Sequence, residues 1–259
     1  MQITIHSKDA FKKTHAAGKL AAQMLEELGQ IVKPGVNLLE LDKYAYDFIN
    51  KYNTKSACYG YKNRNGQPFP GQICTNINHV VCHGFPTDLC LEEGDIIGID
   101  VTLIVDGYHG DTCRTFGVGS IKQEAQDLIE TTKEAMYIGI NAVKANGYTG
   151  DIGYAIENFI RRHPKKYSIV ESYCGHGIGT QFHTAPQIMH HGIKNTGVQL
   201  KEGMFFTVEP MINLGKKETR DLNDGWTVIT KDYKLSAQFE HSIGIGENGV
   251  EIFTSLEQK

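Results

Sequence analysis

The sequence predicts a protein of mixed α and β structure, built from two similar halves in which a helical region precedes an apolar strand ending in an acid. The main support is a repeat at an offset of 109 residues, which pairs Leu91–Asp100 (LEEGDIIGID) with Leu200–Glu209 (LKEGMFFTVE). A weaker match at an offset of 111 residues aligns four positions of the preceding helical regions. These are Lys33, Leu41, Phe48 and Ile49 with Lys144, Ile152, Phe159 and Ile160. A repeat of this length is typical of a duplicated domain as well as of an array.

The segment Gly94–Thr115 of the first half is predicted to be a β-hairpin. Apolar and β-branched residues dominate its first strand, and Asp106-Gly107 is a strong signal for a two-residue turn. With this turn, Asp100 lies diagonally across from Asp111 on one face of the hairpin. The pair could be solvated acids on an edge strand, and Asp111 could be a turn residue. Otherwise the two carboxylates repel each other unless a cation lies between them.

The helices are predicted from capping residues and from apolar periodicity. Ser7 caps a first helix that Gly29 ends, and Asn37 caps a second. In the second half, Ile121–Ala145 has the apolar spacing of a long amphipathic helix, and Asp151 starts a shorter one.

Length and composition narrow the class of protein. The 259 residues form one large domain or two small ones, with 40% hydrophobic and 22% charged residues, as in ordinary globular proteins. The net charge of −4 gives no indication of binding to nucleic acid or to an anionic membrane. No apolar run is long enough to span a bilayer, and the first residues lack the apolar core of a signal peptide. The six cysteines show no CxxC spacing, which favours free thiols in a reducing cytoplasm.

Acidic residues recur in the strands of both halves. The second half contains Glu209 and also Glu240, in the apolar segment LSAQFEHSIGI. Together with Asp100 and Asp111 they make four carboxylates, which could not all ionise at one point without cations. Two divalent ions about 3.5–4 Å apart would suit them. With one imidazole, His176 in a glycine-flanked loop, the set favours Mn, Fe, Co or Zn and predicts metal-assisted hydrolysis.

Plainer interpretations exist for each of these residues taken alone. A histidine in GHGIG is often structural, and the glycines could indicate a phosphate loop, although no strand-loop-lysine pattern supports one. His83 in CHGFP and His183 in FHTAP could be ordinary loop histidines. Trp226 could be a core or rim residue. The combination of these candidates with the internal repeat is stronger than any one of them.

Seven motifs resemble, in order and approximate spacing, those of the type I methionine aminopeptidases. They are GDIIGIDV, DGYHGDTCRTF, CGHGIG, FHTAP, TVEPM, DGWTV and SAQFEHSI. The resemblance extends from AAGKLAA near the N-terminus to NGVEIFT near the C-terminus. It implies the α+β pita-bread fold, with two pseudo-symmetric halves, a curved antiparallel sheet and outer helices. It also implies a single catalytic domain over residues 1–259.

The resemblance implies an enzyme that removes the N-terminal methionine when the second residue is small, using a hydroxide that bridges two divalent metal ions (Co, Mn, Fe or Zn). The implied metal ligands are Asp100, Asp111, His176, Glu209 and Glu240, of which Asp111 and Glu240 bridge the ions. Glu209 is also the implied proton shuttle.

The resemblance also assigns residues to the substrate. His183 would lie beside the scissile amide and its tetrahedral intermediate, and His83 near the substrate nitrogen and carbonyl. The implied methionine pocket consists of Cys58, Tyr61, Phe69, Cys74, Phe182 and Trp226. For the two cysteines, simple burial is the plainer interpretation. The loop Lys62–Gly71 is longer than the usual connection in this family, which concerns the rim of the pocket.

The spacing separates the chain from related enzymes. Only 25 residues (184–208) lie between His183 and Glu209, which leaves no room for the helical insertion of type II enzymes. The chain therefore resembles the short bacterial form, a cytoplasmic and monomeric enzyme that acts on nascent chains near the ribosome. Proline-directed peptidases share the fold but usually have an additional N-terminal domain. A catalytically dead binding module typically loses metal ligands, and all five are present here.

Overall fold

The predicted hairpin is present in the computed structural model, which describes residues 3–256. It consists of β4 (Ile96–Val105) and β5 (Tyr108–Gly117). Its turn residues have the positive φ angles of a two-residue hairpin turn, 48° at Asp106 and 78° at Gly107. The register pairs Asp100 with Cys113 and Thr102 with Asp111, so Asp100 and Asp111 are diagonal neighbours on one face. The prediction for this segment is confirmed.

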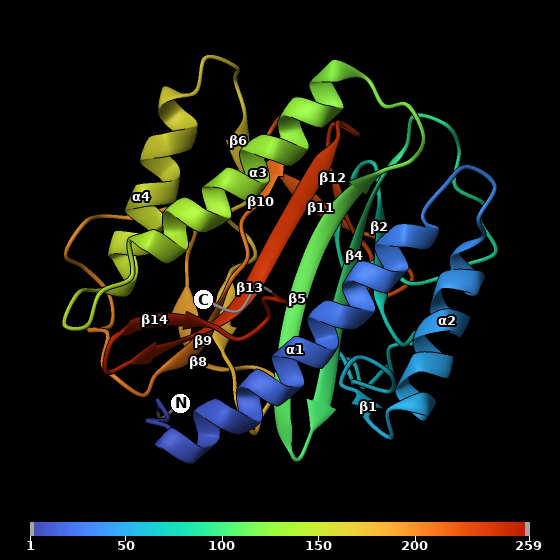
Figure 1. The fold of residues 1–259 in the computed structure, drawn as a ribbon. Helices are drawn as coiled ribbons and strands as arrows, with labels where there is room; N and C mark the ends of the chain where they lie inside the picture. The colour runs from blue at the N-terminus through green and yellow to red at the C-terminus, as the bar shows by residue number, and fades with distance from the viewer. Residues whose placement is uncertain (1–2, 257–259) are drawn as a thin grey trace.

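The hairpin belongs to an 11-stranded sheet whose main path runs β1-β4-β5-β13-β9-β7-β8 (Figure 1). The long strand β13 (Ser236–Gly246) joins the halves, because it pairs with β5 on one side and with β9 (Phe205–Val208) on the other. The other strands of this sheet are β1 (Lys55–Ser56), β2 (Cys74–Ile77), β6 (Ser168–Ile169), β7 (Gly175–Gly177), β8 (Thr184–Ile188), β10 (Met211–Asn213) and β14 (Gly249–Ile252). A smaller sheet contains β3 (Val80–Cys82), β11 (Thr219–Asp221) and β12 (Val228–Thr230).

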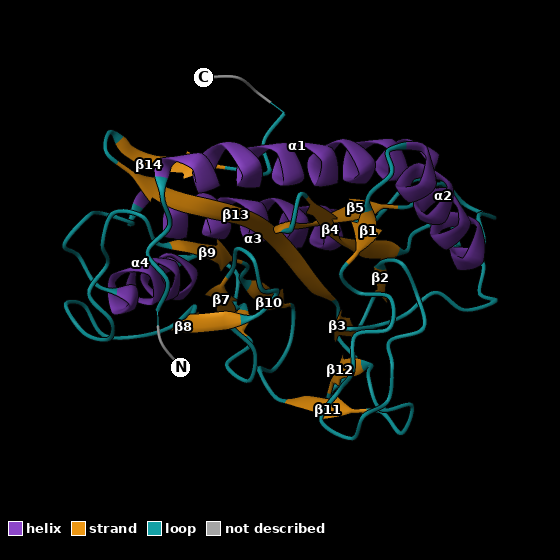
Figure 2. Cartoon of the chain, turned by 90° about the horizontal axis from the view of Figure 1, so that it is seen from below, coloured by secondary structure: helices purple, strands orange, loops and turns teal. Residues whose placement is uncertain are grey.

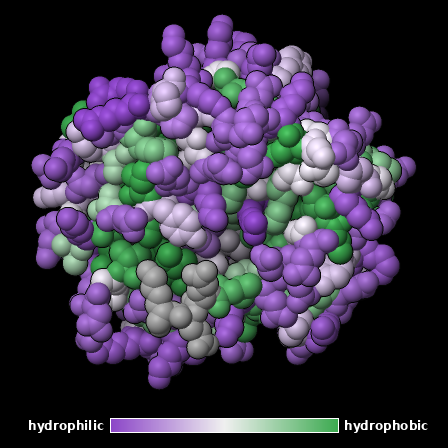
Figure 3. Space-filling model, turned by 45° about the horizontal axis from the view of Figure 1, so that its top comes forward, coloured by the Kyte–Doolittle hydropathy of each residue, from purple (hydrophilic) through white to green (hydrophobic). Residues whose placement is uncertain are grey.

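Within residues 3–256, four helices repeat the same order in both halves. They are α1 (Lys8–Ile31), α2 (Leu38–Lys51), α3 (Gln123–Asn141) and α4 (Thr149–Arg162). α2 and α4 begin 111 residues apart, at Leu38 and Thr149, which is the offset of the weaker sequence match. Seen from below, α1 and α3 lie along the same side of the sheet (Figure 2). None of the helices within residues 3–256 is both long and apolar enough to cross a membrane. The helix-bearing side is mainly hydrophilic, with separate apolar patches (Figure 3).

Alternation along the strands decides which side chains face these helices. In β4 the odd-numbered residues, such as Ile99 and Val101, pack into the core beneath α1 and α2. In β13 the same holds for Ala237 and Phe239, which pack beneath α3. Because successive side chains point to opposite faces of a strand, the even-numbered positions point away from the helices. The acidic positions of both strands are even-numbered.

Several predicted helix ends are wrong, two of them for reasons of packing and capping. α1 continues past Gly29 to Ile31, and a Cβ atom at Gly29 would lie 2.3 Å from the ring of Phe116. Gly29 is therefore required by close packing and does not end the helix. α4 begins at Thr149 rather than at Asp151, whose Oδ2 accepts the backbone N–H of Tyr148 at 2.8 Å. The carboxylate thus caps the helix from inside its first turn. The helix predicted over Ile121–Ala145 is shorter, as α3 spans Gln123–Asn141.

Gly110 allows α1 to rest directly on β5. A Cβ atom there would lie 2.4 Å from the backbone of Ala17 and Gly18. We expect Gly110→Ala to lower the free energy of unfolding by about 3 kcal/mol, because helix and strand must separate. Gly98→Ala is the matched control, since its Cβ would approach no atom closer than 3.4 Å. Equal urea midpoints for the two variants would contradict the expectation.

Candidate metal centre and active site

The predicted metal ligands lie on neighbouring strands of the large sheet. Asp100 and Asp111 come from β4 and β5, and Glu240 comes from β13 between the two halves. Glu209 follows β9 directly, and His176 is the central residue of β7. Because β4, β5, β13, β9 and β7 are consecutive in the sheet, residues up to 140 positions apart in sequence meet at one place.

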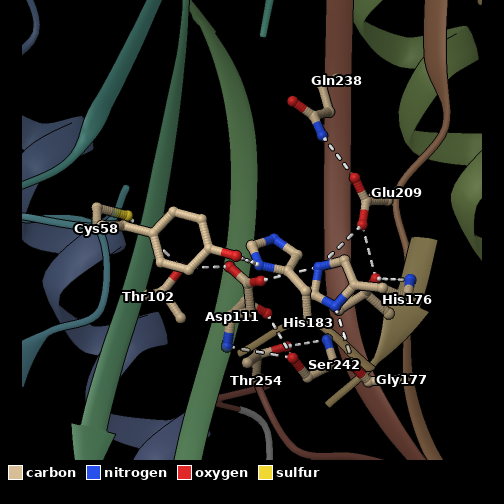
Figure 4. Close-up of polar contacts among 12 residues, drawn as sticks. Cys58, Thr102, Asp111, His176, Gly177, His183, Glu209, Gln238, Ser242 and Thr254 are labelled. Atoms are coloured by element: carbon tan, nitrogen blue, oxygen red, sulfur yellow. Dashed lines mark hydrogen bonds and ion pairs between the residues drawn. The ribbon is translucent and has the colours of Figure 1, made fainter. Parts of the chain in front are cut away.

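Neutral side chains fix two of the carboxylates (Figure 4). The Thr102 hydroxyl donates to Asp111 Oδ1 at 2.7 Å, and the Thr207 hydroxyl donates to Glu209 Oε1 at 2.6 Å. The Gln238 amide donates from Nε2 to Glu209 Oε2 at 3.3 Å. These bonds orient the carboxylates but bring no positive charge.

Burial makes this cluster electrostatically costly. Desolvation raises the pKa of Asp100 to about 7 and the pKa of Glu209 to about 8. Desolvation also raises the pKa values of Asp111 and Glu240, and repulsion from the neighbouring carboxylates adds to it. The four groups can all be ionised at neutral pH only if cations lie among them.

His176 presents a free nitrogen to this cluster. Its Nδ1 donates to the carbonyl oxygen of Gly177 at 3.1 Å, which leaves the lone pair on Nε2. That Nε2 lies 3.5 Å from Asp111 Oδ2 and 3.6 Å from Glu209 Oε1. Burial lowers the pKa of His176 to about 4, so the ring is neutral. A lone pair facing two carboxylates is the arrangement that a shared cation would stabilise.

The donor set fits divalent metal ions. Ligand atoms of Asp111, His176 and Glu240 all lie within 4.8 Å of one another. Asp100 Oδ1 and Glu240 Oε1 are buried, and within residues 3–256 neither has a hydrogen-bond partner. Buried carboxylate oxygens without donors are expensive unless they bind a cation. Three or more carboxylates and one neutral imidazole suit first-row transition ions.

Two further histidines, His83 and His183, lie near the cluster. The His183 ring centroid is 4.3 Å from that of His176, and its Nδ1 shares a hydrogen bond of 3.1 Å with the Tyr61 hydroxyl. Burial lowers the pKa of His183 to about 3 and also lowers the pKa of His83. His83 has a φ of +57°, and its ring lies edge-on to Trp226 with centroids 6.5 Å apart. Both imidazoles are therefore neutral hydrogen-bonding groups.

The predicted pocket residues form one apolar group next to these histidines. Cys58, Phe69 and Cys74 are buried together, with Phe85, Phe182 and Trp226 packed against them. The sixth predicted residue, Tyr61, lies edge-on to Phe182 with ring centroids 5.3 Å apart. The Cys58 sulfur lies 3.8 Å from the Thr102 hydroxyl, so this group adjoins the carboxylates. All thirteen predicted site residues thus lie in one continuous region.

Sequence reasoning missed several members of the region. Thr102, Thr207 and Gln238 each lie two positions from an acid on the same strand face, so the two-residue periodicity was a usable signal. Phe85 lies two residues after His83 in the motif CHGFP, from which only the histidine was predicted to belong to the site.

Known proteins that are similar to this chain identify its family. Residues 12–247 match the model of metallopeptidase family M24. The chain belongs to this family. It is 49% identical over 260 residues to a methionine aminopeptidase of Rickettsia prowazekii, covering 100% of this chain and 98% of the relative. It is 46% identical to the methionine aminopeptidase of Escherichia coli, covering 98% and 94%. The chain therefore falls among the methionine aminopeptidases of family M24.

Solved structures confirm the pita-bread fold of this M24 chain. The crystal structure of the Rickettsia prowazekii methionine aminopeptidase matches with a TM-score of 0.94, covering 98% of this chain and 100% of that one. The Thermotoga maritima methionine aminopeptidase matches with a TM-score of 0.93 at 31% identity, with the same coverage. A prolidase from Pyrococcus furiosus, with a TM-score of 0.74 at 22% identity, covers 98% of this chain and 66% of that one and shows the shared fold alone.

Proposed function

We propose that this M24 chain is a methionyl aminopeptidase that removes the N-terminal methionine from nascent proteins and peptides whose second residue is small. The supporting observation is the adjacency of two sites. A cluster of acids and one imidazole lies beside an apolar pocket that contains Cys58, Cys74 and Phe182. Such a pocket suits the unbranched, polarisable side chain of methionine.

The metal ligands in this proposal are Asp100, Asp111, His176, Glu209 and Glu240, and they would hold two divalent ions (Co, Mn, Fe or Zn). Ions bound there would polarise the scissile carbonyl and lower the pKa of water, so that a nucleophile is available at neutral pH. Asp111 and Glu240, which extend from the adjacent strands β5 and β13, would be carboxylate ligands in this set.

The remaining roles belong to protein side chains. Glu209, held by Thr207 and Gln238, would carry a proton from the attacking water to the leaving amine. His183 is neutral and hydrogen-bonded to Tyr61, so it can donate to the oxygen that becomes negative in the transition state. His83, neutral at the edge of the pocket, would contact the substrate nitrogen and carbonyl.

We further propose a cytoplasmic monomer that works on chains leaving the ribosome and binds neither nucleic acid nor membrane. Residues 1–259 would form a single catalytic domain, although positions 1–2 and 257–259 lie outside the described residues. The sheet that connects both halves through β13 supports a single unit.

A metal titration tests the proposed function. Chelator-treated protein should not cleave Met-Ala-Ser, and addition of Mn, Fe, Co or Zn should restore methionine release. An Xaa-Pro peptide should remain intact under the same conditions. Cleavage of the Xaa-Pro peptide alone would instead indicate a proline-directed peptidase. No cleavage of either peptide with any of the four ions would contradict the enzyme proposal.

A further inference from the structure

The long loop that follows Cys58 folds as a small hairpin over residues 61–69, which we call the rim hairpin. The backbone N–H of Phe69 donates to the Tyr61 carbonyl at 2.7 Å, and the N–H of Asn63 donates to the Gln67 carbonyl at 3.0 Å. The Asn63 side-chain oxygen accepts two further backbone N–H groups inside the turn, from Asn65 and Gln67, at 2.9 and 3.0 Å. The loop therefore has a defined shape of its own.

The rim hairpin is fastened to the distant turn that precedes Trp226. Asn63 Nδ2 donates to the carbonyl of Gly225 at 2.8 Å, and Gln67 Nε2 donates to the carbonyl of Asp224 at 2.8 Å. These bonds cross 162 and 157 positions of sequence. The two surfaces are also in close contact, because a Cβ atom at Gly225 would lie 2.2 Å from Gln67 Oε1.

The turn that begins at Asp224 also holds Trp226 in place. Asp224 Oδ1 accepts the backbone N–H groups of Trp226 and Thr227, both at 2.8 Å. The indole packs edge-on against Phe69, with ring centroids 5.1 Å apart, and Phe69 is the buried end of the rim hairpin. The rim hairpin is thus linked to Trp226 in two ways. It bonds to the backbone of the preceding turn, and its Phe69 ring packs against the indole. At its other end, Tyr61 bonds to His183.

We infer that the rim hairpin is a positioning element that fixes Trp226 as a wall of the methionine pocket, and that Asn63 and Gln67 set the selectivity of the site for the first side chain. The inference rests on the proposed function. A displaced wall fits the substrate side chain less well, so KM should rise and discrimination against other apolar side chains should fall. The chemistry at the carboxylates should change little, because neither Asn63 nor Gln67 contacts them.

The two hydrogen bonds from Asn63 and Gln67 to the turn at residues 224–225 are here called the clamp. Isosteric substitutions can remove these bonds while keeping the hairpin. Asn63→Asp retains the oxygen that accepts the turn N–H groups but replaces the donor by an oxygen facing the Gly225 carbonyl. Gln67→Glu replaces the donor Nε2 by an oxygen that faces the carbonyl of Asp224. Asn65→Asp is the control for each single substitution: it adds one negative charge to the same hairpin at a side chain that, within residues 3–256, makes no hydrogen bond. Gln67→Glu alone, on an exposed loop, serves if the double variant does not fold.

Two readouts test the inference. For Met-Ala-Ser, the double variant should show KM raised about 10-fold and kcat within about twofold, and its preference for Met-Ala-Ser over Leu-Ala-Ser should fall about 10-fold. Trp226 is the single tryptophan of the chain, so indole fluorescence reports on this wall alone. Acrylamide should quench it about twice as strongly in the double variant, whereas Asn65→Asp should match the wild type in both readouts.

The readouts separate the two proposals. Unchanged quenching and unchanged preference in the double variant would overturn the inference, even if the wild type cleaves Met-Ala-Ser. Increased quenching with unchanged preference would also overturn it, because the clamp would then hold Trp226 without setting selectivity. A wild type without any aminopeptidase activity would overturn the proposed function and the selectivity role with it, whereas the quenching result would still report on the clamp.

Discussion

The variant Asp111→Asn is expected to lower kcat/KM for Met-Ala-Ser by about 1,000-fold. Asp111 is buried, and its Oδ2 lies 3.5 Å from His176 Nε2, where a cation would be shared. The amide keeps the size of the carboxylate, and its oxygen can still accept from Thr102. It removes one negative charge, so the affinity for divalent ions should fall as well. Mn²⁺ should raise the melting temperature of the wild type, and this rise should be absent in the variant.

Loss of activity must be distinguished from loss of folding. In the metal-free state, Asp111→Asn should be at least as stable as the wild type, because it removes a charge that neighbouring carboxylates repel. Asp47→Asn is the control, since Asp47 is exposed on α2 and, among residues 3–256, forms an ion pair with Lys43 alone. Wild-type activity in Asp111→Asn, or a large loss of activity in Asp47→Asn, would show that the carboxylate cluster is not the active site.

Local signals made the first half of the site predictable. The Asp106-Gly107 turn fixes the register of β4 and β5, and the register places Asp100 and Asp111 on one face. The repeat made it possible to predict the counterpart acid Glu209 in the second half. The roles of the histidines and of the pocket came from resemblance to a family, because no periodicity in the chain connects His83 with His183.

Contacts between distant segments explain what the sequence did not reveal. The bond from Gln67 to the carbonyl of Asp224 joins positions 157 residues apart, and neither residue type marks such a partner. A glycine such as Gly29 is typical of a helix end. Here, however, packing against Phe116 requires a glycine inside the helix. Local preferences are weak beside tertiary packing, which decides both cases.

Metal removal should make the stability of this protein depend strongly on pH. In the metal-free fold, burial raises the pKa of Glu209 from 4.5 to about 8 and that of Asp100 from 3.8 to about 7. The folded state therefore binds more protons than the unfolded state between these values, and the free energy of unfolding falls as pH rises through them. Buried histidines such as His176 have the opposite effect, but only below their ordinary pKa of 6.5.

The informative window therefore lies between about pH 7.5 and about pH 8.5, about one unit or more above the ordinary pKa of histidine, where the histidines are largely neutral in both states. Across it, chelator-treated protein should lose about 1 kcal/mol of unfolding free energy, measured by urea denaturation. Saturating Mn²⁺ should remove most of this dependence of unfolding free energy on pH, because bound cations stabilise the ionised carboxylates.

The variant Glu209→Gln should flatten the dependence of unfolding free energy on pH in the metal-free protein, since it abolishes the group with the pKa near 8. A metal-free wild type that is equally stable at both pH values would mean that these carboxylates are not held together in a water-poor site, and the electrostatic argument for the metal centre would fail.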